Sequence, residues 1–222
     1  EETEFVDTTK SVWNYSLLTP EDVTNYQNGT NYQLYKKFGS HSIQVNGTWG
    51  MYFCVWAPNA SAVSVKGNFN DWKNHEYELY PRWDKSGIWE GFIPGFKLGE
   101  AYKYHIIGYA KRALDKGDPF ANFWEKRPQT ASITWDMYYE WKDAAWMKNR
   151  KKKNALDAPW SVYELHLASW QRPVKDDEEA YNSYDQITET LVPYIKELGF
   201  THIELMTIKG RSIIASSTPP RA

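Results

Sequence analysis

The sequence predicts a mainly β protein in which an antiparallel β-sandwich is followed by a βαβ unit. Between residues 41 and 136, short apolar runs alternate with Gly, Pro and Asn-Asp turn signals, a spacing typical of sandwiches of roughly 100 residues. Beyond residue 160, a strand-like run, an amphipathic helical stretch and a second strand-like run follow one another. The 12 Trp, 16 Tyr and 9 Phe supply large side chains for the core.

Residues 1–40 are expected to form an amino-terminal segment of short helical turns and irregular structure. Thr19 is placed as a helix N-cap, because Pro20 and two acidic residues follow it in the first turn. The segment that follows, residues 41–140, carries the predicted sandwich. Its clearest strand is AVSVKGNF, where Val63 and Val65 alternate with small or polar residues, as in a strand with one solvent-facing side.

The sequence positions of the single cysteine and of four tryptophans predict whether each side chain is buried in this core or exposed. The single cysteine, Cys54, lies in the apolar run MYFCVW and is expected to be a buried, inert thiol in a reducing compartment. Trp83 lies between Arg82 and Asp84 and is expected to be exposed, with no assigned role. Strand context places three further tryptophans in the core: Trp49, Trp56 and Trp89.

The carboxyl-terminal part predicts a linker, a βαβ unit and a tail. Residues 141–159 form the linker, with the RKKK run as a solvated cluster. In residues 160–206, SVYELHLASW and THIELM are strands around a helix that Pro193 kinks or divides and Gly199 ends. Its apolar stripe comprises Ile187, Leu191, Ile195 and Leu198. Residues 207–222 are small, polar and rich in proline, and we expect disorder there.

Composition excludes several classes of function. A formal net charge of -2 argues against a protein that tracks nucleic-acid phosphates. No stretch of about 18 apolar residues indicates a membrane span, and the start EETEF is unlike a signal peptide, so we expect a cytoplasmic protein. A secreted immunoglobulin-like adhesion domain is an alternative, because four N-x-[ST] sequons occur: Asn14, Asn28, Asn46 and Asn59.

The sequence contains no motif that indicates a metal site or a cofactor site. The five histidines show no H-E-x-x-H spacing, and no glycine-rich phosphate loop is present, so we expect neither a metal nor a cofactor. Glu164 and His166 lie two residues apart and would face the same side of one strand. We interpret them as a structural hydrogen-bonded pair rather than as groups that act on a substrate.

Several runs closely resemble the amino-terminal part of bacterial glycogen branching enzymes (1,4-α-glucan branching enzymes), in order and nearly without gaps over about residues 13–206. The runs are YQNGTNYQLYKKFGSH, GMYFCVWAPNASAVSVKGNFNDW, SGIWEGFIPGFKLGEAYKYHI, DKGDPFANFWEKRPQTASITWD, YELHLASWQRP and YDQITETLVPYIKELGFTHIELM. The resemblance stops after Met206. We therefore expect residues 207–222 to be foreign to the family, through truncation, frameshift or cloning, with a truncated reading frame preferred.

The resemblance implies a more specific fold and reaction. Residues 41–140 would be an immunoglobulin-like β-sandwich carbohydrate-binding module, and residues 160–206 the incomplete βαβ start of a (β/α)8 catalytic barrel. The implied partners are α-glucans, namely glycogen, amylose and amylopectin, and the barrel within the intact protein. Branching transfers an α-1,4-glucan segment to a 6-hydroxyl with two carboxyl groups about 5 to 5.5 Å apart. In the family these lie on later barrel strands, so we expect no catalytic residue here and no branching by this chain alone.

Two sugar-binding residues follow from a second resemblance. The turn GNFNDW and the strand AYKYHI are similar to the glycogen-binding module of the AMP-activated kinase β subunit. By that likeness, Trp72 would stack against a sugar and Lys103 would donate to a sugar hydroxyl. A second tryptophan of that module, expected within residues 110–114, is absent. The alternative for Trp72 is a structural role in closing the sandwich edge.

Other functions remain open at the level of sequence. A stand-alone α-glucan-binding module or scaffold would share the same sandwich without catalysis. A fragment of a trehalohydrolase or debranching enzyme would share both the module and the barrel. YELHLASW and LVPYIKELGFTHIELM favour branching enzymes among these.

Overall fold

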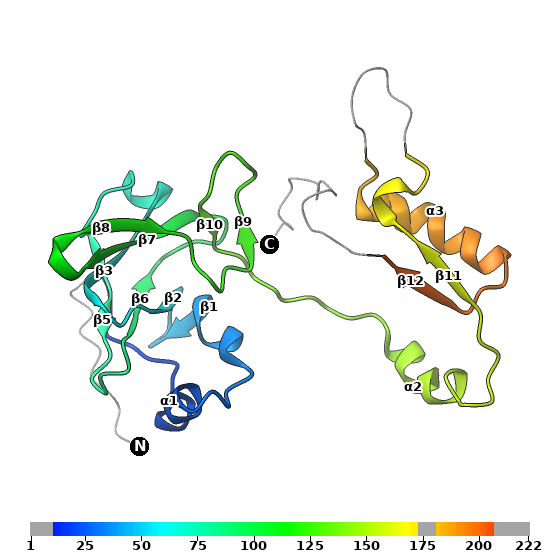
Figure 1. Ribbon diagram of the computed structural model, residues 1–222, viewed down its shortest axis with the longest axis horizontal. Helices are drawn as coiled ribbons and strands as arrows, with labels where there is room; N and C mark the ends of the chain where they lie inside the picture. Colours follow the sequence, from blue (N-terminus) through cyan, green and yellow to red (C-terminus); the bar gives the residue numbers. More distant parts are fainter. Residues whose placement is uncertain (1–10, 173–180, 207–222) are drawn as a thin grey trace. The chain divides into compact units, whose positions relative to one another are not determined.

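The computed structural model describes residues 11–172 and 181–206, so the predicted tail lies outside the described residues. The chain divides into two compact units, residues 1–139 and 140–222. The first unit is built from two antiparallel sheets (Figure 1). Its strands confirm a mainly β protein with antiparallel sheets.

The first sheet, here sheet A, has four strands in the order β1-β2-β6-β5. The bounds are β1 Gly39–Val45, β2 Thr48–Trp56, β6 Ile88–Pro94 and β5 Tyr80–Pro81. The second, sheet B, follows the order β4-β3-β7-β10-β9, with β8 also paired to β7. The bounds are β4 Tyr77–Glu78, β3 Ala60–Gly67, β7 Ala101–Gly108, β10 Ser132–Ile133, β9 Phe123–Trp124 and β8 Ala113–Lys116.

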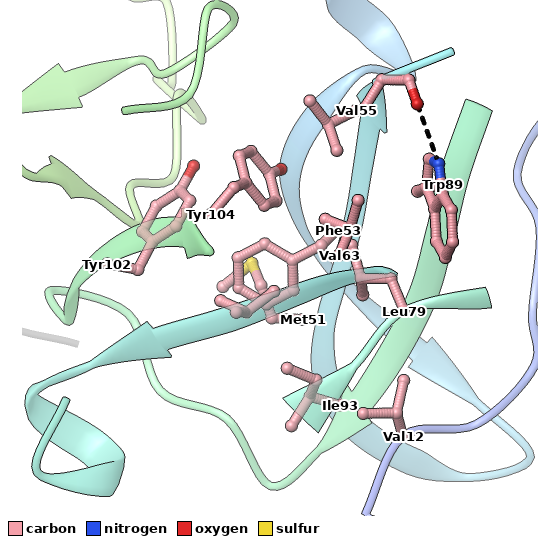
Figure 2. Packing of buried hydrophobic residues seen from close by; sticks show 12 residues of the cluster. Val12, Met51, Phe53, Val55, Val63, Leu79, Trp89, Ile93, Tyr102 and Tyr104 are labelled. Atoms are coloured by element: carbon pink, nitrogen blue, oxygen red, sulfur yellow. Dashed lines mark hydrogen bonds between the residues drawn. The ribbon is translucent and has the colours of Figure 1, made fainter. Parts of the chain in front are cut away.

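The main core lies between these sheets (Figure 2). Alternate residues of β2 and β3 point into it, which is the period-2 consequence of a pleated strand. Phe53 meets Tyr102 edge to face at 5.1 Å between ring centroids. The Trp89 indole N–H donates to the Ala57 carbonyl at 3.1 Å, the bond that is dashed in Figure 2. The Trp89 prediction is thereby confirmed.

A second core covers the opposite face of sheet A. Residues 12–38, including helix α1 (Pro20–Gln27), pack there on Tyr52, Cys54 and Phe92. Helix α1 starts as predicted: the Thr19 side chain accepts from the Asp22 amide, and the Asp22 carboxylate accepts from the Thr19 amide. Cys54 is fully buried, as expected, and burial raises the pKa of its thiol well above the ordinary value.

Two tryptophan predictions are wrong. Trp49 and Trp56 are 62% and 52% exposed, although their strand β2 is otherwise nearly buried. Both lie close to the ends of β2, where one of the two neighbouring strands has stopped pairing: β6 pairs only as far as Gly50, and β1 only as far as Cys54. The Trp56 ring meets Tyr26 edge to face, and its indole N–H donates to the Ser86 carbonyl at 3.1 Å. Trp83 is exposed, as predicted.

The second unit contains a parallel βαβ arrangement. Strands β11 (Val162–Leu165) and β12 (His202–Leu205) pair in parallel, in register from Val162 opposite His202. Helix α3 (Tyr184–Glu197) connects them, with a short 3-10 turn, Leu167–Ser169, after β11. Ile187, Leu191 and Ile195 of the predicted stripe are buried against Leu165 and Leu167.

Several local expectations in this unit need correction. Helix α3 is not divided at Pro193 but continues through it, with buried apolar residues before and after the proline. Leu198 of the predicted stripe is 51% exposed, since it is the C-cap residue. Gly199 has φ +78°, as expected for the residue that ends the helix. The expected linker contains helix α2 (Ala144–Lys153), which ends in the basic run, a favourable place for cations.

Candidate carbohydrate-binding surface

The two sheets of the first unit differ in what covers them. The outer side of sheet A lies beneath residues 12–38, whereas the outer side of sheet B presents polar side chains. On β3, Val63 and Val65 point to the core, so Ser64 and Lys66 point outward. We call the side of sheet B that carries Ser64, Lys66, Lys103, His105 and Asp115 the outer face. The turn with Asn74 and His75 lies over part of this face, where Lys66 donates to Asn74 and His75 packs on His105, whereas Lys103 and Asp115 stay accessible.

Lys103 lies at the centre of this outer face. It is the register partner of Lys66 across the β3–β7 pair, so two cations stand directly opposite one another. Each ammonium group turns to a different partner: Lys103 Nζ donates to Thr130 Oγ1 at 2.8 Å, and Lys66 Nζ donates to Asp115 Oδ2, also at 2.8 Å. Lys103 remains partly exposed and keeps donors to spare. The structure therefore adds Thr130, a residue that the sequence did not single out.

Trp72 lies in the turn between β3 and β4. Its backbone N–H donates to the Gly67 carbonyl at 2.9 Å, and its indole N–H donates to Asn68 Oδ1 at 3.0 Å. Asp71 and Trp72 have φ of +53° and +58°, an unusual pair of left-handed residues outside glycine. Asn70 supports this turn by accepting from the Gly67 amide at 3.0 Å. The partly exposed indole is thus held in one position.

The Trp72 turn reaches the outer face beside Lys66. Asn74, two residues after Trp72, accepts from Lys66 Nζ at 2.9 Å. Gly67, which follows Lys66, anchors the Trp72 amide, and Lys66 is the partner of Lys103. Both predicted sugar-binding residues therefore lie at the same end of the β3–β7 pair.

An acidic residue completes the polar network. Asp115 lies on β8. Its Oδ2 atom accepts from Lys66 Nζ, and its Oδ1 atom lies 2.7 Å from His105 Nδ1. Burial opposes ionisation of Asp115, but hydrogen bonds from Lys66 and His105 outweigh it and hold the pKa of this carboxyl below its ordinary value. The carboxylate therefore stays charged at neutral pH.

The first unit also carries aromatic side chains that the sequence did not single out. Residues Tyr109–Lys111 form a 3-10 turn, and the Tyr109 side chain is 91% exposed. Trp124 packs over Gly117, where a Cβ would come within 2.4 Å of the ring. Phe123 stacks on Trp135 with ring centroids 4.6 Å apart. No sequence spacing identified these residues, because each depends on which loops the sheet brings together.

A groove of about 630 Å³ lies beside β4 and β5, and residues of both strands line it. Its lining includes Val63, His75 and Trp89, and neither Trp72 nor Lys103 contributes. The groove and the predicted sugar-binding residues are therefore separate features.

In the second unit, Glu164 and His166 are exposed, and Glu164 stands opposite Glu204 across the parallel pair.

Residues 11–172 and 181–206 show neither a metal centre nor a membrane span. Within these ranges, no group of three or more His, Cys, Asp or Glu could hold a metal ion. Likewise, no helix in the described part of the chain is long and apolar enough to cross a membrane.

In sequence, the first unit is similar to a carbohydrate-binding module. Residues 37–121 match the family model for carbohydrate-binding module 48 (isoamylase N-terminal domain). A solved structure from Salmonella typhimurium, assigned provisionally as an alpha amylase, shares the fold with a TM-score of 0.51. It is 20% identical, and the match covers 77% of this chain and 24% of that one.

More specifically, the chain is similar to the amino-terminal region of 1,4-alpha-glucan branching enzymes. It is 43% identical over 193 residues to the enzyme GlgB of Desulfitobacterium hafniense, which covers 86% of this chain. It is 44% identical over 191 residues to GlgB of Bacillus subtilis, with the same coverage. The chain spans about 30% of the length of these relatives. The resemblance noted in the sequence is confirmed.

Proposed function

We propose that the sandwich binds α-1,4-glucans on the outer face of sheet B, with Trp72 and Lys103 as contacts. One observation carries the proposal: the β3–β7 pair brings the rigid Trp72 turn and the partly exposed Lys103 to the same end of one sheet face. Glycogen, amylose and amylopectin are the ligands that the branching-enzyme relatives make most relevant.

The chemistry of each group fits a sugar ligand. The weakly apolar C–H face of a glucosyl unit packs on an indole ring, and its hydroxyl groups need donors and acceptors. Lys103 supplies donors, and Thr130 supplies a hydroxyl that can donate and accept. Because the Trp72 indole is already hydrogen-bonded to Asn68, little side-chain entropy is lost when a sugar stacks on it.

The test is affinity electrophoresis of residues 1–222 in gels with and without amylopectin. We expect Trp72→Ala and Lys103→Ala to abolish most of the retardation that the unaltered chain shows. Trp83→Ala is the matched control, because Trp83 is 79% exposed and lies outside the outer face. Retardation that is unchanged by both substitutions, or lost equally in the control, would contradict the assigned site.

The βαβ arrangement of the second unit supports a further part of the proposal. We propose that β11, α3 and β12 are the first elements of a (β/α)8 barrel, and that residues 141–159 link this barrel to the module. Parallel strands with a covering helix are the repeating unit of that fold. Active sites of such barrels are assembled from the ends of several strands, and a βαβ unit supplies two of them.

A polypeptide of residues 1–222 is therefore expected to transfer no glucan by itself, whereas the parent reaction moves an α-1,4-glucan segment to a 6-hydroxyl. The measurement is the formation of α-1,6 linkages in amylose by the purified polypeptide, and new branches would refute this part. A cytoplasmic location belongs to the same proposal, because an unpaired buried thiol is ordinary in a reducing compartment. Fractionation of cells that produce the intact protein would check the location.

A further inference from the structure

The outer face of sheet B extends beyond Lys103 to the edge strand β8. There, Lys66, His105 and Asp115 form a connected network in which Asp115 accepts from both basic side chains. The three side chains differ sharply in accessibility: Lys66 is 11% exposed and His105 7%, whereas Asp115 is 41% exposed. Of these three side chains, Asp115 is therefore the one that a ligand on this face can reach.

We propose that Asp115 is a second contact for the same α-glucan, accepting hydrogen bonds from the hydroxyl groups of a glucosyl unit beyond the one at Trp72 and Lys103. This inference rests on the proposed function and deepens it. Lys66 and His105 act as positioning residues, because each donates to one oxygen of the carboxylate and fixes its plane.

The hydrogen-bonding capacity of Asp115 supports this role. An ionised carboxylate offers about four lone-pair sites, and one donor on each oxygen leaves others open to the solvent. Vicinal sugar hydroxyls are donors that match such a fixed carboxylate. Because the network already orients the side chain, contact with a sugar costs little additional ordering.

The spacing on the sheet matches a single oligosaccharide. Lys103 and His105 are two residues apart on β7, and His105 is the register partner of Asp115 on β8. At about 3.4 Å per residue along a strand and about 4.8 Å between strands, the backbones of Lys103 and Asp115 lie roughly 8 Å apart. One glucan chain that crosses from β7 to β8 can thus contact both residues.

A purely structural role for Asp115, as an anchor for β8, is the competing explanation. Such an anchor would require the ion pair to Lys66 but would gain nothing from the exposed side of the carboxylate. The two roles separate in experiment, because an anchor changes stability whereas a sugar contact changes affinity for long glucans.

The test is isothermal titration calorimetry of residues 1–222 with maltose and with maltoheptaose, together with thermal melting of each variant. We expect Asp115→Asn and Asp115→Ser to weaken maltoheptaose binding by about tenfold, the effect of losing one or two hydrogen bonds to a charged group. The gain in affinity from maltose to maltoheptaose should shrink in both variants. Asp22→Asn is the matched control, since it removes another Lys–Asp ion pair on the covered side of sheet A.

The outcomes distinguish the two proposals. If Trp72→Ala weakens binding but both Asp115 variants bind maltoheptaose within about twofold of the unaltered chain, the second contact is refuted and the proposed function stands. If the unaltered chain binds neither sugar, both proposals fall. If the Asp115 variants and Asp22→Asn lose affinity only in proportion to their loss of melting temperature, Asp115 is an anchor and the inference is overturned.

Discussion

Arg82 and Glu90 form an ion pair inside the first unit, with 2.7 Å between Arg82 Nη1 and Glu90 Oε1. Both side chains are at most 5% exposed. The pair also holds the amino-terminal segment, because Arg82 donates to Ser16 Oγ at 2.6 Å and to the Leu18 carbonyl at 3.2 Å. Glu90 accepts from the Tyr52 hydroxyl at 2.5 Å on the same side of sheet A.

Removal of Arg82 is therefore expected to destabilise the first unit strongly. Arg82→Met leaves the Glu90 carboxylate buried without its cation, a change that costs about 3–5 kcal/mol in comparable buried pairs. Urea unfolding followed by tryptophan fluorescence measures this loss. Lys37→Met is the control, because the Lys37–Asp22 pair is more exposed and its loss should cost about 1 kcal/mol or less. Equal losses in the two variants would contradict the assigned role.

Asp118 predicts a pH dependence of stability. It is fully buried, and two tyrosine hydroxyls donate to it, Tyr102 at 2.6 Å and Tyr104 at 3.0 Å. Burial raises the pKa of Asp118 above its ordinary value and outweighs these hydrogen bonds. Since the folded state then binds the proton more tightly than the unfolded state, Asp118 contributes less stability as pH rises from the unfolded pKa through the folded pKa.

The measurement compares the unaltered chain with Asp118→Asn, which does not titrate. The difference in free energy of unfolding, unaltered minus variant, should fall as pH rises above about 4, the region where an unfolded aspartate ionises. Tyr102→Phe tests the hydrogen bond separately and is expected to cost about 1 kcal/mol or more at every pH in that range. A stability difference that rises with pH would show that the hydrogen bonds, rather than burial, dominate at Asp118.

The sequence predicted the secondary-structure elements of this fold better than the burial of individual side chains within them. The Val63 and Val65 core positions, the Thr19 cap and the α3 stripe up to Ile195 are local patterns that the structure contains, but the side of β3 expected to face solvent is buried at Ser64 and Lys66. Trp49 and Trp56 were placed wrongly, because the exposure of a strand residue depends on how far the neighbouring strands extend. A local pattern carries no information about that length.

The candidate site shows the same contrast between what a local pattern predicts and what depends on residues distant in sequence. Trp72 and Lys103 were chosen by resemblance, and their common location on the outer face follows from the β3–β7 register. Thr130 and Asp115 were missed, since they enter through strands and loops distant in sequence: Thr130 lies 27 residues from Lys103, and Asp115 lies 49 from Lys66. Single-sequence spacing cannot reveal partners at such separations.

Gly67 links the fold to the site and gives the last prediction. A Cβ on Gly67 would lie 2.0 Å from the Ala101 carbonyl oxygen and 2.6 Å from the Phe69 ring, so Gly67→Ala must push β3 away from β7. We expect a loss of about 1–3 kcal/mol, typical of overpacking, and weaker amylopectin retardation because the Trp72 amide is anchored on the Gly67 carbonyl. Gly108→Ala is the control at the other end of the same strand pair, where the nearest atom to an added Cβ is 3.7 Å away. Calorimetric melting and affinity electrophoresis of both variants check the prediction, and a Gly67→Ala protein as stable as Gly108→Ala would refute the close approach of β3 and β7 at this point.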